Sequence, residues 1–179
     1  DHIFGLDDLR VFNFRQGSGI ACYGAAPTLA ALRRVFAYAF EAGPEGGGRP
    51  QIELLPIDGR CAIGGVDFLP VPVWHGETPV LGYRVGRFAY VTDCSRVPPA
   101  SEELLRDLDV LVLGALRYRP HPTHMTIAQA CELVSRLRPR RAVLTHLAHE
   151  VDHGAPPWPL PERVEFGYDG LSFEVSHEF

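Results

Sequence analysis

The sequence of 179 residues lacks several features, and each absence narrows what the protein can be. No apolar run reaches the roughly 18 residues that a membrane-spanning helix needs, which argues against a membrane protein. The four cysteines lie far apart, at Cys22, Cys61, Cys94 and Cys131, and include no C-x-x-C pair. That spacing favours buried thiols in a reducing compartment over a disulfide framework or a zinc finger. We therefore expect a cytoplasmic protein that makes no use of a membrane.

Positive charge is also in short supply, since 17 basic against 22 acidic residues leave a net charge of −5. Such a chain is poorly suited to hold nucleic acid by bulk electrostatic attraction, so we do not expect nucleic acid as a partner. What is present is typical of a folded globular protein: 46% hydrophobic and 22% charged residues. At roughly 150 residues per domain, this length predicts one domain over residues 1–179.

The hydrophobic pattern changes twice along the chain, from a helical period to short strands and back. Helices are expected over residues 3–16, 27–40, 101–106 and 126–137. Strands are expected over residues 20–23, 51–56, 65–73, 80–85, 88–92, 110–113, 141–145 and 171–175. No helix separates the consecutive strands in the middle of the chain, so the pattern favours a layered α/β protein over a doubly wound one.

Histidine and aspartate recur where the expected strands end. His75, Asp93 and His146 each follow an apolar strand, and Asp1 and His2 stand directly before the first helix. A buried strand interior has no use for such side chains, because an unpaired polar group there costs about 1–3 kcal/mol. At strand ends they can meet at one edge of a sheet, where imidazoles and carboxylates form the ligand set that zinc prefers. Any one of them alone is typical of a hydrogen-bonded loop residue.

Four stretches of the sequence resemble motifs of the metallo-β-lactamase superfamily, in the same order. Residues 1–10, DHIFGLDDLR, resemble the second half of its H-x-H-x-D-H motif and the helix that follows. Residues 72–76, PVWHG, resemble the strand end that carries its third histidine, and residues 81–93 the stretch that carries its bridging aspartate. Residues 144–147, LTHL, resemble the strand end of its last ligand. Within the superfamily, the likeness is greatest to bacterial phosphodiesterases that act on phosphoribosyl cyclic phosphate, then to tRNA 3′-processing endonucleases.

The resemblance implies an α/β fold of the metallo-β-lactamase type, a four-layer αββα sandwich that lacks its first strands in this chain. The two histidines of the H-x-H half should precede Asp1 by two and four residues, and the sequence does not contain them. We therefore expect residues 1–179 to be one N-terminally incomplete domain of a longer protein. The alternative is a truncated, non-catalytic domain.

The resemblance also implies two divalent metal ions, zinc in the first place and manganese in the second. His75 would join the first ion, His2 and His146 the second, and Asp93 would bridge them. Asp1 would serve the second ion and counts among the catalytic residues. Two such ions lower the pKa of a shared water, so that hydroxide exists near neutral pH.

His124 lies just ahead of the helix expected over residues 126–137. In the phosphodiesterases that the chain resembles, a histidine at the matching position gives a proton to the leaving oxygen. That role suits an imidazole, whose pKa is near the working pH. The alternative is a helix cap or a hydrogen bond to a loop carbonyl. We expect His121 to be a bystander, and the Cys94 thiol to point away from Asp93, its neighbour on an extended segment.

Arg117, at the end of a strand that leads into this loop, could hold a substrate phosphate through its forked donors. The alternative is an ion pair with Asp7 or Asp8. His149 and His153 have the i,i+4 spacing of a helical metal pair, but prolines follow closely, which favours a loop.

These observations lead to a prediction of a metal-dependent hydrolase. It would cleave the phosphodiester of a small or cyclic nucleotide-like molecule with a metal-activated hydroxide. The alternative is a tRNA 3′-processing endonuclease, although the short insertion over residues 42–50 is no substrate-gripping arm. The sequence leaves the oligomeric state open, and a homodimer is one possibility because dimers are common among enzymes of this resemblance.

Overall fold

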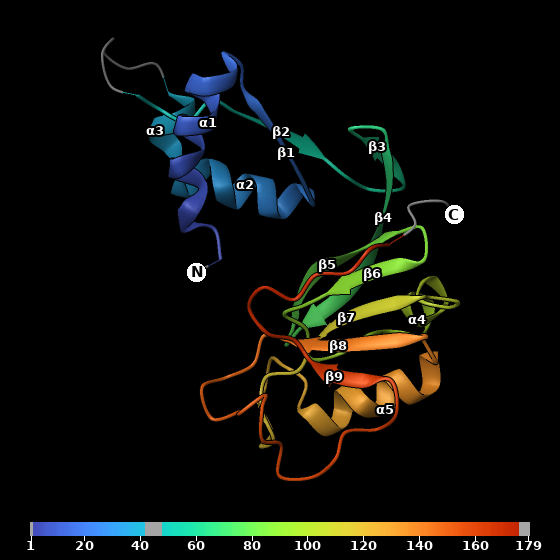
Figure 1. Cartoon of the computed structure of the whole chain (residues 1–179). Coiled ribbons are helices and arrows are strands. Elements are labelled where there is room, and N and C mark those ends of the chain that lie inside the picture. Colours follow the sequence, from blue (N-terminus) through green and yellow to red (C-terminus); the bar gives the residue numbers. More distant parts are fainter. Residues whose placement is uncertain (1, 42–47, 176–179) are drawn as a thin grey trace. The chain divides into compact units, whose positions relative to one another are not determined.

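The computed structural model describes residues 2–41 and 48–175 (Figure 1). The chain divides into two compact units, Asp1–Asp58 and Gly59–Phe179, called here the N-terminal and the C-terminal unit. Each is described by itself, and the single domain expected over residues 1–179 stays a prediction. Among the described residues, no helix has both the length and the apolar character needed to cross a membrane.

The N-terminal unit pairs two short parallel strands with helices, in the order η1 (Phe4–Asp8), α1 (Leu9–Gln16), β1 (Ile20–Gly24), α2 (Ala26–Val35), α3 (Ala37–Phe40) and β2 (Ile52–Pro56). Its buried core consists of Leu29, Leu32 and Phe36 among the described residues. The single helix expected over residues 27–40 is wrong in one respect: Phe36 leaves the helical conformation and separates α2 from α3. Its ring is buried in the core, which fixes the chain at that break.

The C-terminal unit is built on a seven-stranded sheet in which the strands follow one another in sequence order (Figure 1). The strands are β3 (Cys61–Ile63), β4 (Val66–His75), β5 (Thr78–Val85), β6 (Phe88–Val91), β7 (Val110–Gly114), β8 (Arg141–Thr145) and β9 (Val164–Phe166). Neighbours from β3 to β6 are antiparallel, and those from β6 to β9 are parallel. The expected run of strands without intervening helices is thus confirmed for β4–β6, whereas β2, expected as the first of the run, pairs with β1 in a separate sheet.

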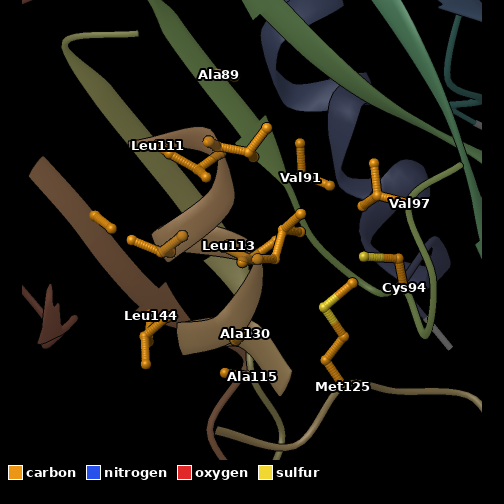
Figure 2. Close-up of a cluster of buried hydrophobic side chains, with 14 of the residues drawn as sticks. Ala89, Val91, Cys94, Val97, Leu111, Leu113, Ala115, Met125, Ala130 and Leu144 are labelled. Atoms are coloured by element: carbon orange, nitrogen blue, oxygen red, sulfur yellow. The ribbon is translucent and has the colours of Figure 1, made fainter. Parts of the chain in front are cut away.

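Two helices accompany this sheet, α4 (Pro99–Leu104) and α5 (Ile127–Leu137). Thr126 caps α5 as expected: its hydroxyl accepts from the Gln129 N–H, while the Gln129 side chain accepts from the Thr126 N–H. The apolar stripe of α5 belongs to the main core, together with alternate residues of β6, β7 and β8 (Figure 2). The other alternate residues, including Val110, Val112 and Val143, form a smaller cluster on the opposite sheet face.

The strand expected over residues 171–175 is wrong. Leu171 and Phe173 do alternate, but they contribute side chains to the smaller cluster and their backbone does not join the sheet. The last strand is β9, which pairs with β8 through Ala142 and Val164. With three residues, both β9 and β3 are too short to show a period, which is why the sequence pattern missed them.

Strand direction explains why the expected site residues share an edge. The parallel strands β6 and β8 have their carboxyl ends at the same edge of the sheet, so Asp93 and His146 emerge together. From β4 to β6 the direction reverses twice, through the antiparallel strand β5. His75, the last residue of β4, therefore reaches this edge as well.

Candidate functional site

Asp93 lies at the centre of a half-buried cluster on this edge. Its Oδ1 atom is removed from solvent and lies 3.0 Å from Nε2 of His146 and 3.4 Å from Nδ1 of His124. The carboxylate is thus shared between two imidazoles that come from different segments of the chain.

The backbone at both strand ends is strained. Asp93 and His146 have φ angles of 56° and 60°, in the left-handed region that residues other than glycine seldom adopt. Such conformations cost on the order of 1–3 kcal/mol and persist only where the surroundings enforce them, most often at functional sites. Here the left-handed residue redirects the chain, directly after β8 at His146 and two residues beyond β6 at Asp93.

His75 and His124 face one another across the cluster. Their Nε2 atoms are 3.4 Å apart, and the ring centroids are 4.8 Å apart in an edge-on arrangement. The pKa of His124 is lowered to about 4, chiefly because the ring is withdrawn from water, an effect that the Asp93 carboxylate offsets only in part. At neutral pH the ring is therefore uncharged and presents one N–H and one lone pair.

Backbone hydrogen bonds tie the loops that carry these residues to one another. The Met125 N–H donates to the Cys94 carbonyl at 2.9 Å, which joins the His124 loop to the Asp93 segment. The Leu116 carbonyl accepts from Ala148, which joins the loop after β7 to the one after His146. Figure 2 shows the side chains of Met125 and Cys94 close together in the main core. A site whose loops are held in this way is preorganised rather than assembled on binding.

Two glycines allow the close approach of these loops. A Cβ atom on Gly114 would lie 3.1 Å from the Asp93 backbone nitrogen, and one on Gly76 would lie 3.0 Å from Cγ2 of Thr123. Gly76 also has a φ of +59°, so a side chain there would be strained as well as crowded. It directly follows His75 and touches the loop that carries His124.

The chemistry of this cluster fits a divalent metal ion. His75, Asp93 and His124 each offer one ligand atom, and these atoms lie within 4.8 Å of one another. His146 adds a further imidazole nitrogen against the same carboxylate. Imidazole nitrogen with carboxylate oxygen is a donor set that zinc and manganese accept.

The other expected metal ligands belong to the N-terminal unit. Asp1 lies outside the described residues. His2 lies in the turn before η1, and its part in a metal site stays a prediction.

Arg117 is engaged inside its own loop. It donates to the carbonyls of Arg119 and Pro120, at 3.3 and 3.0 Å, and Glu150 lies 3.9 Å away. Arg117 thus has a structural carboxylate neighbour within its own unit, Glu150, whereas a pair with Asp7 or Asp8 stays untested. Phosphate binding by Arg117 stays a prediction.

The remaining histidines and Cys94 show no feature that assigns them a role in the cluster. His121 receives a long contact from the Thr123 N–H, and its ring centroid lies 4.8 Å from that of His124. His149 and His153 are exposed and lie in a loop, as expected. Cys94 is buried in the core, and burial raises the pKa of its thiol to about 12, so it is inert as a ligand.

Sequence reasoning missed Ser95, whose hydroxyl contacts the backbone on both sides of His75. No spacing rule could have singled it out, because the partner segments are some twenty residues apart and meet only in the folded sheet.

Comparisons with known proteins bear on the family and the fold of the chain. Residues 1–147 match a family model described as "Beta-lactamase superfamily domain". A crystal structure described as a new diphosphatase from the PhnP family is 37% identical, with a TM-score of 0.85, over 94% of this chain and 64% of that one. Human tRNase Z, short form, is 16% identical with a TM-score of 0.60, over 88% of this chain and 68% of that one, a likeness of fold alone.

An octanoyltransferase of Porphyromonas gingivalis (strain ATCC BAA-308 / W83) is 33% identical over 175 residues. The match covers 96% of this chain but only 35% of that protein. The chain thus spans about a third of the octanoyltransferase and just under two thirds of the diphosphatase.

Proposed function

Because the chain belongs to the beta-lactamase superfamily and has its mixed α/β fold, we propose that it carries the centre of a metal-dependent hydrolase. Its substrate would be a small or cyclic nucleotide-like phosphodiester. The observation that supports this best is the convergence of His75, Asp93, His124 and His146 from four separate segments into one half-buried cluster.

His75, Asp93 and His146 would hold the metal ions, zinc first and manganese second, with the Asp93 carboxylate shared between two ions. Bound divalent ions supply Lewis acidity and lower the pKa of a coordinated water. The protein holds these ligands in place: the left-handed backbone at Asp93 and His146 aims both side chains at one point. Partial burial strengthens their electrostatic effect on a substrate.

His124 would give a proton to the leaving oxygen, since an alkoxide leaves poorly without one. Its ring stands between those of His75 and His146, with centroid distances of 4.8 and 5.0 Å. A phosphodiester is anionic, and a negative charge beside an imidazole favours its protonated form. Substrate binding and proton donation at His124 are therefore compatible.

The substrate class draws on the diphosphatase, the structure with 37% identity and a TM-score of 0.85. A phosphodiester and an organic diphosphate both present an anionic phosphoryl group to the same cluster. The octanoyltransferase adds nothing to the choice of substrate class. The match covers only about a third of its length, and nothing assigns acyl transfer to that third. The tRNA 3′-processing activity stays the alternative, supported by fold alone.

A substrate panel tests the proposal on the full-length protein. We expect bis-p-nitrophenyl phosphate and an organic diphosphate diester to be cleaved after loading with zinc or manganese, and cleavage to stop on chelation and return on reloading. Cleavage of a precursor tRNA alone would favour the endonuclease. A protein that binds metal but cleaves none of the three would refute the proposal.

A further inference from the structure

The Ser95 hydroxyl links the two chain segments that carry His75 and Asp93. Its Oγ atom accepts a hydrogen bond from the Gly76 N–H at 3.0 Å and donates one to the Trp74 carbonyl at 3.0 Å. Trp74 and Gly76 are the residues on either side of His75, and Ser95 lies two residues beyond Asp93. One side chain therefore holds the peptide groups before and after His75.

Backbone hydrogen bonds also join these two segments, whereas the Gly76 N–H bonds to the Ser95 side chain. The Trp74 N–H donates to the Arg96 carbonyl at 3.0 Å, and the Ser95 N–H donates to the Trp74 carbonyl at 2.7 Å. These two bonds hold Trp74 on one side, and on the other side β4 pairs with β5 as far as His75 and Thr78. The chain then turns at Gly76, where φ is +59°, and the Gly76 N–H donates to the Ser95 hydroxyl.

We propose that Ser95 is a positioning residue that sets the His75 imidazole against the Asp93 carboxylate, an inference that rests on the proposed metal site. Outer partners of metal ligands fix the orientation of those ligands, and their loss weakens metal binding by about 10–100-fold. Without the hydroxyl, the Gly76 N–H loses its hydrogen bond and only the pairing of His75 with Thr78 holds the turn, so His75 samples orientations away from Asp93. The effect falls on metal affinity rather than on folding, because the backbone bonds at Trp74 remain.

The test compares Ser95→Ala with Ser95→Thr, which keeps the hydroxyl, and with Ser135→Ala as a matched control. Ser135 donates to the Glu132 carbonyl on an exposed part of α5. The affinity of each full-length variant for zinc is measured by competition with a chromophoric chelator, and the melting temperature is measured on the metal-free protein. We expect Ser95→Ala to bind zinc about 10–100-fold more weakly, and the other two variants to bind like the wild type.

Equal zinc affinity in Ser95→Ala and the wild type would overturn the role of Ser95 and leave the proposed function intact. A metal-free Ser95→Ala protein that melts well below Ser135→Ala would assign the hydroxyl to folding, which also overturns the inference. If the wild type itself binds neither zinc nor manganese, the proposed function fails, and the inference fails with it.

Discussion

The two units of this chain differ in how completely they bury their apolar side chains. The main core of the C-terminal unit runs through the sheet and both helices. The hydrophobic cluster described in the N-terminal unit has three buried residues, while Phe14 is 91% and Phe4 67% exposed. A segment of this size cannot enclose much apolar surface, whereas one twice as long can. A strained cluster of titratable groups needs a rigid support, and the C-terminal unit supplies it.

The largest effect is expected at the centre of the cluster. Asp93→Ala removes the carboxylate that faces both His124 and His146, so hydrolysis should fall to the background rate and metal content should fall with it. Elemental analysis and a phosphodiesterase assay measure the two. Asp67→Ala is the control, an exposed carboxylate of the same sheet that pairs with Arg60. Full metal content in Asp93→Ala would contradict its role as a ligand.

The next effect separates the proton donor from the ligands. His124→Ala should retain metal and lose about 10²–10⁴-fold in rate on a substrate with an alkoxide leaving group. With p-nitrophenolate, which leaves without a proton, the loss should be much smaller. Steady-state kinetics on both substrates test this. Loss of metal to the same extent as in Asp93→Ala would show instead that His124 is a ligand.

The contrast between the two cores can be tested by truncating one leucine in each. Leu111→Ala, in a fully buried position, should lower the free energy of unfolding by about 2–5 kcal/mol. Leu32→Ala should lower it less, because its neighbours are fewer and can relax. Urea unfolding followed by tryptophan fluorescence, which reports Trp74 and Trp158 of the C-terminal unit, is compared with circular dichroism. One domain requires a single coincident transition, and two separate transitions would contradict that prediction.

The smallest effect compares one glycine from each unit. Gly17 and Gly76 both have positive φ, at 67° and 59°, but only at Gly76 would a Cβ meet a neighbour. An alanine at either position costs about 1–2 kcal/mol from the left-handed backbone alone. Only Gly76→Ala should also weaken zinc binding, because its methyl group pushes against Thr123. Chelator competition with both variants measures the zinc affinity. Equal zinc affinities would mean that the loop carrying His124 can move to accommodate the methyl group.

Much of the sheet could be predicted from the sequence because its strands are apolar runs bounded by turn residues. The helical period of the apolar residues also located α5, and the Thr126 cap placed its start correctly. The short strands β3 and β9 were not predicted. The alternation of Leu171 and Phe173 led to a wrong prediction of a strand, because alternation indicates burial on one side of a segment and not backbone pairing. The helix break at Phe36 was not predicted, because it accompanies the burial of the Phe36 ring in the core, which the local sequence pattern does not show.

For the candidate site, His75, Asp93 and His146 were predictable because a titratable side chain after a buried strand is conspicuous. The left-handed backbone of Asp93 and His146 was not predictable, and neither was the engagement of Arg117 by its own loop and Glu150. These features depend on segments that are distant in sequence. Ser95 belongs to the same class.

The antiparallel strand β5 has a consequence for how the protein can vary. It reverses the chain between β4 and β6, and a second reversal restores the original heading. Were a single strand inserted or deleted between them, His75 would emerge at the far rim, a strand length or about 30 Å away. His75 therefore stays beside Asp93 only if strands are gained or lost there in pairs, whatever their sequence.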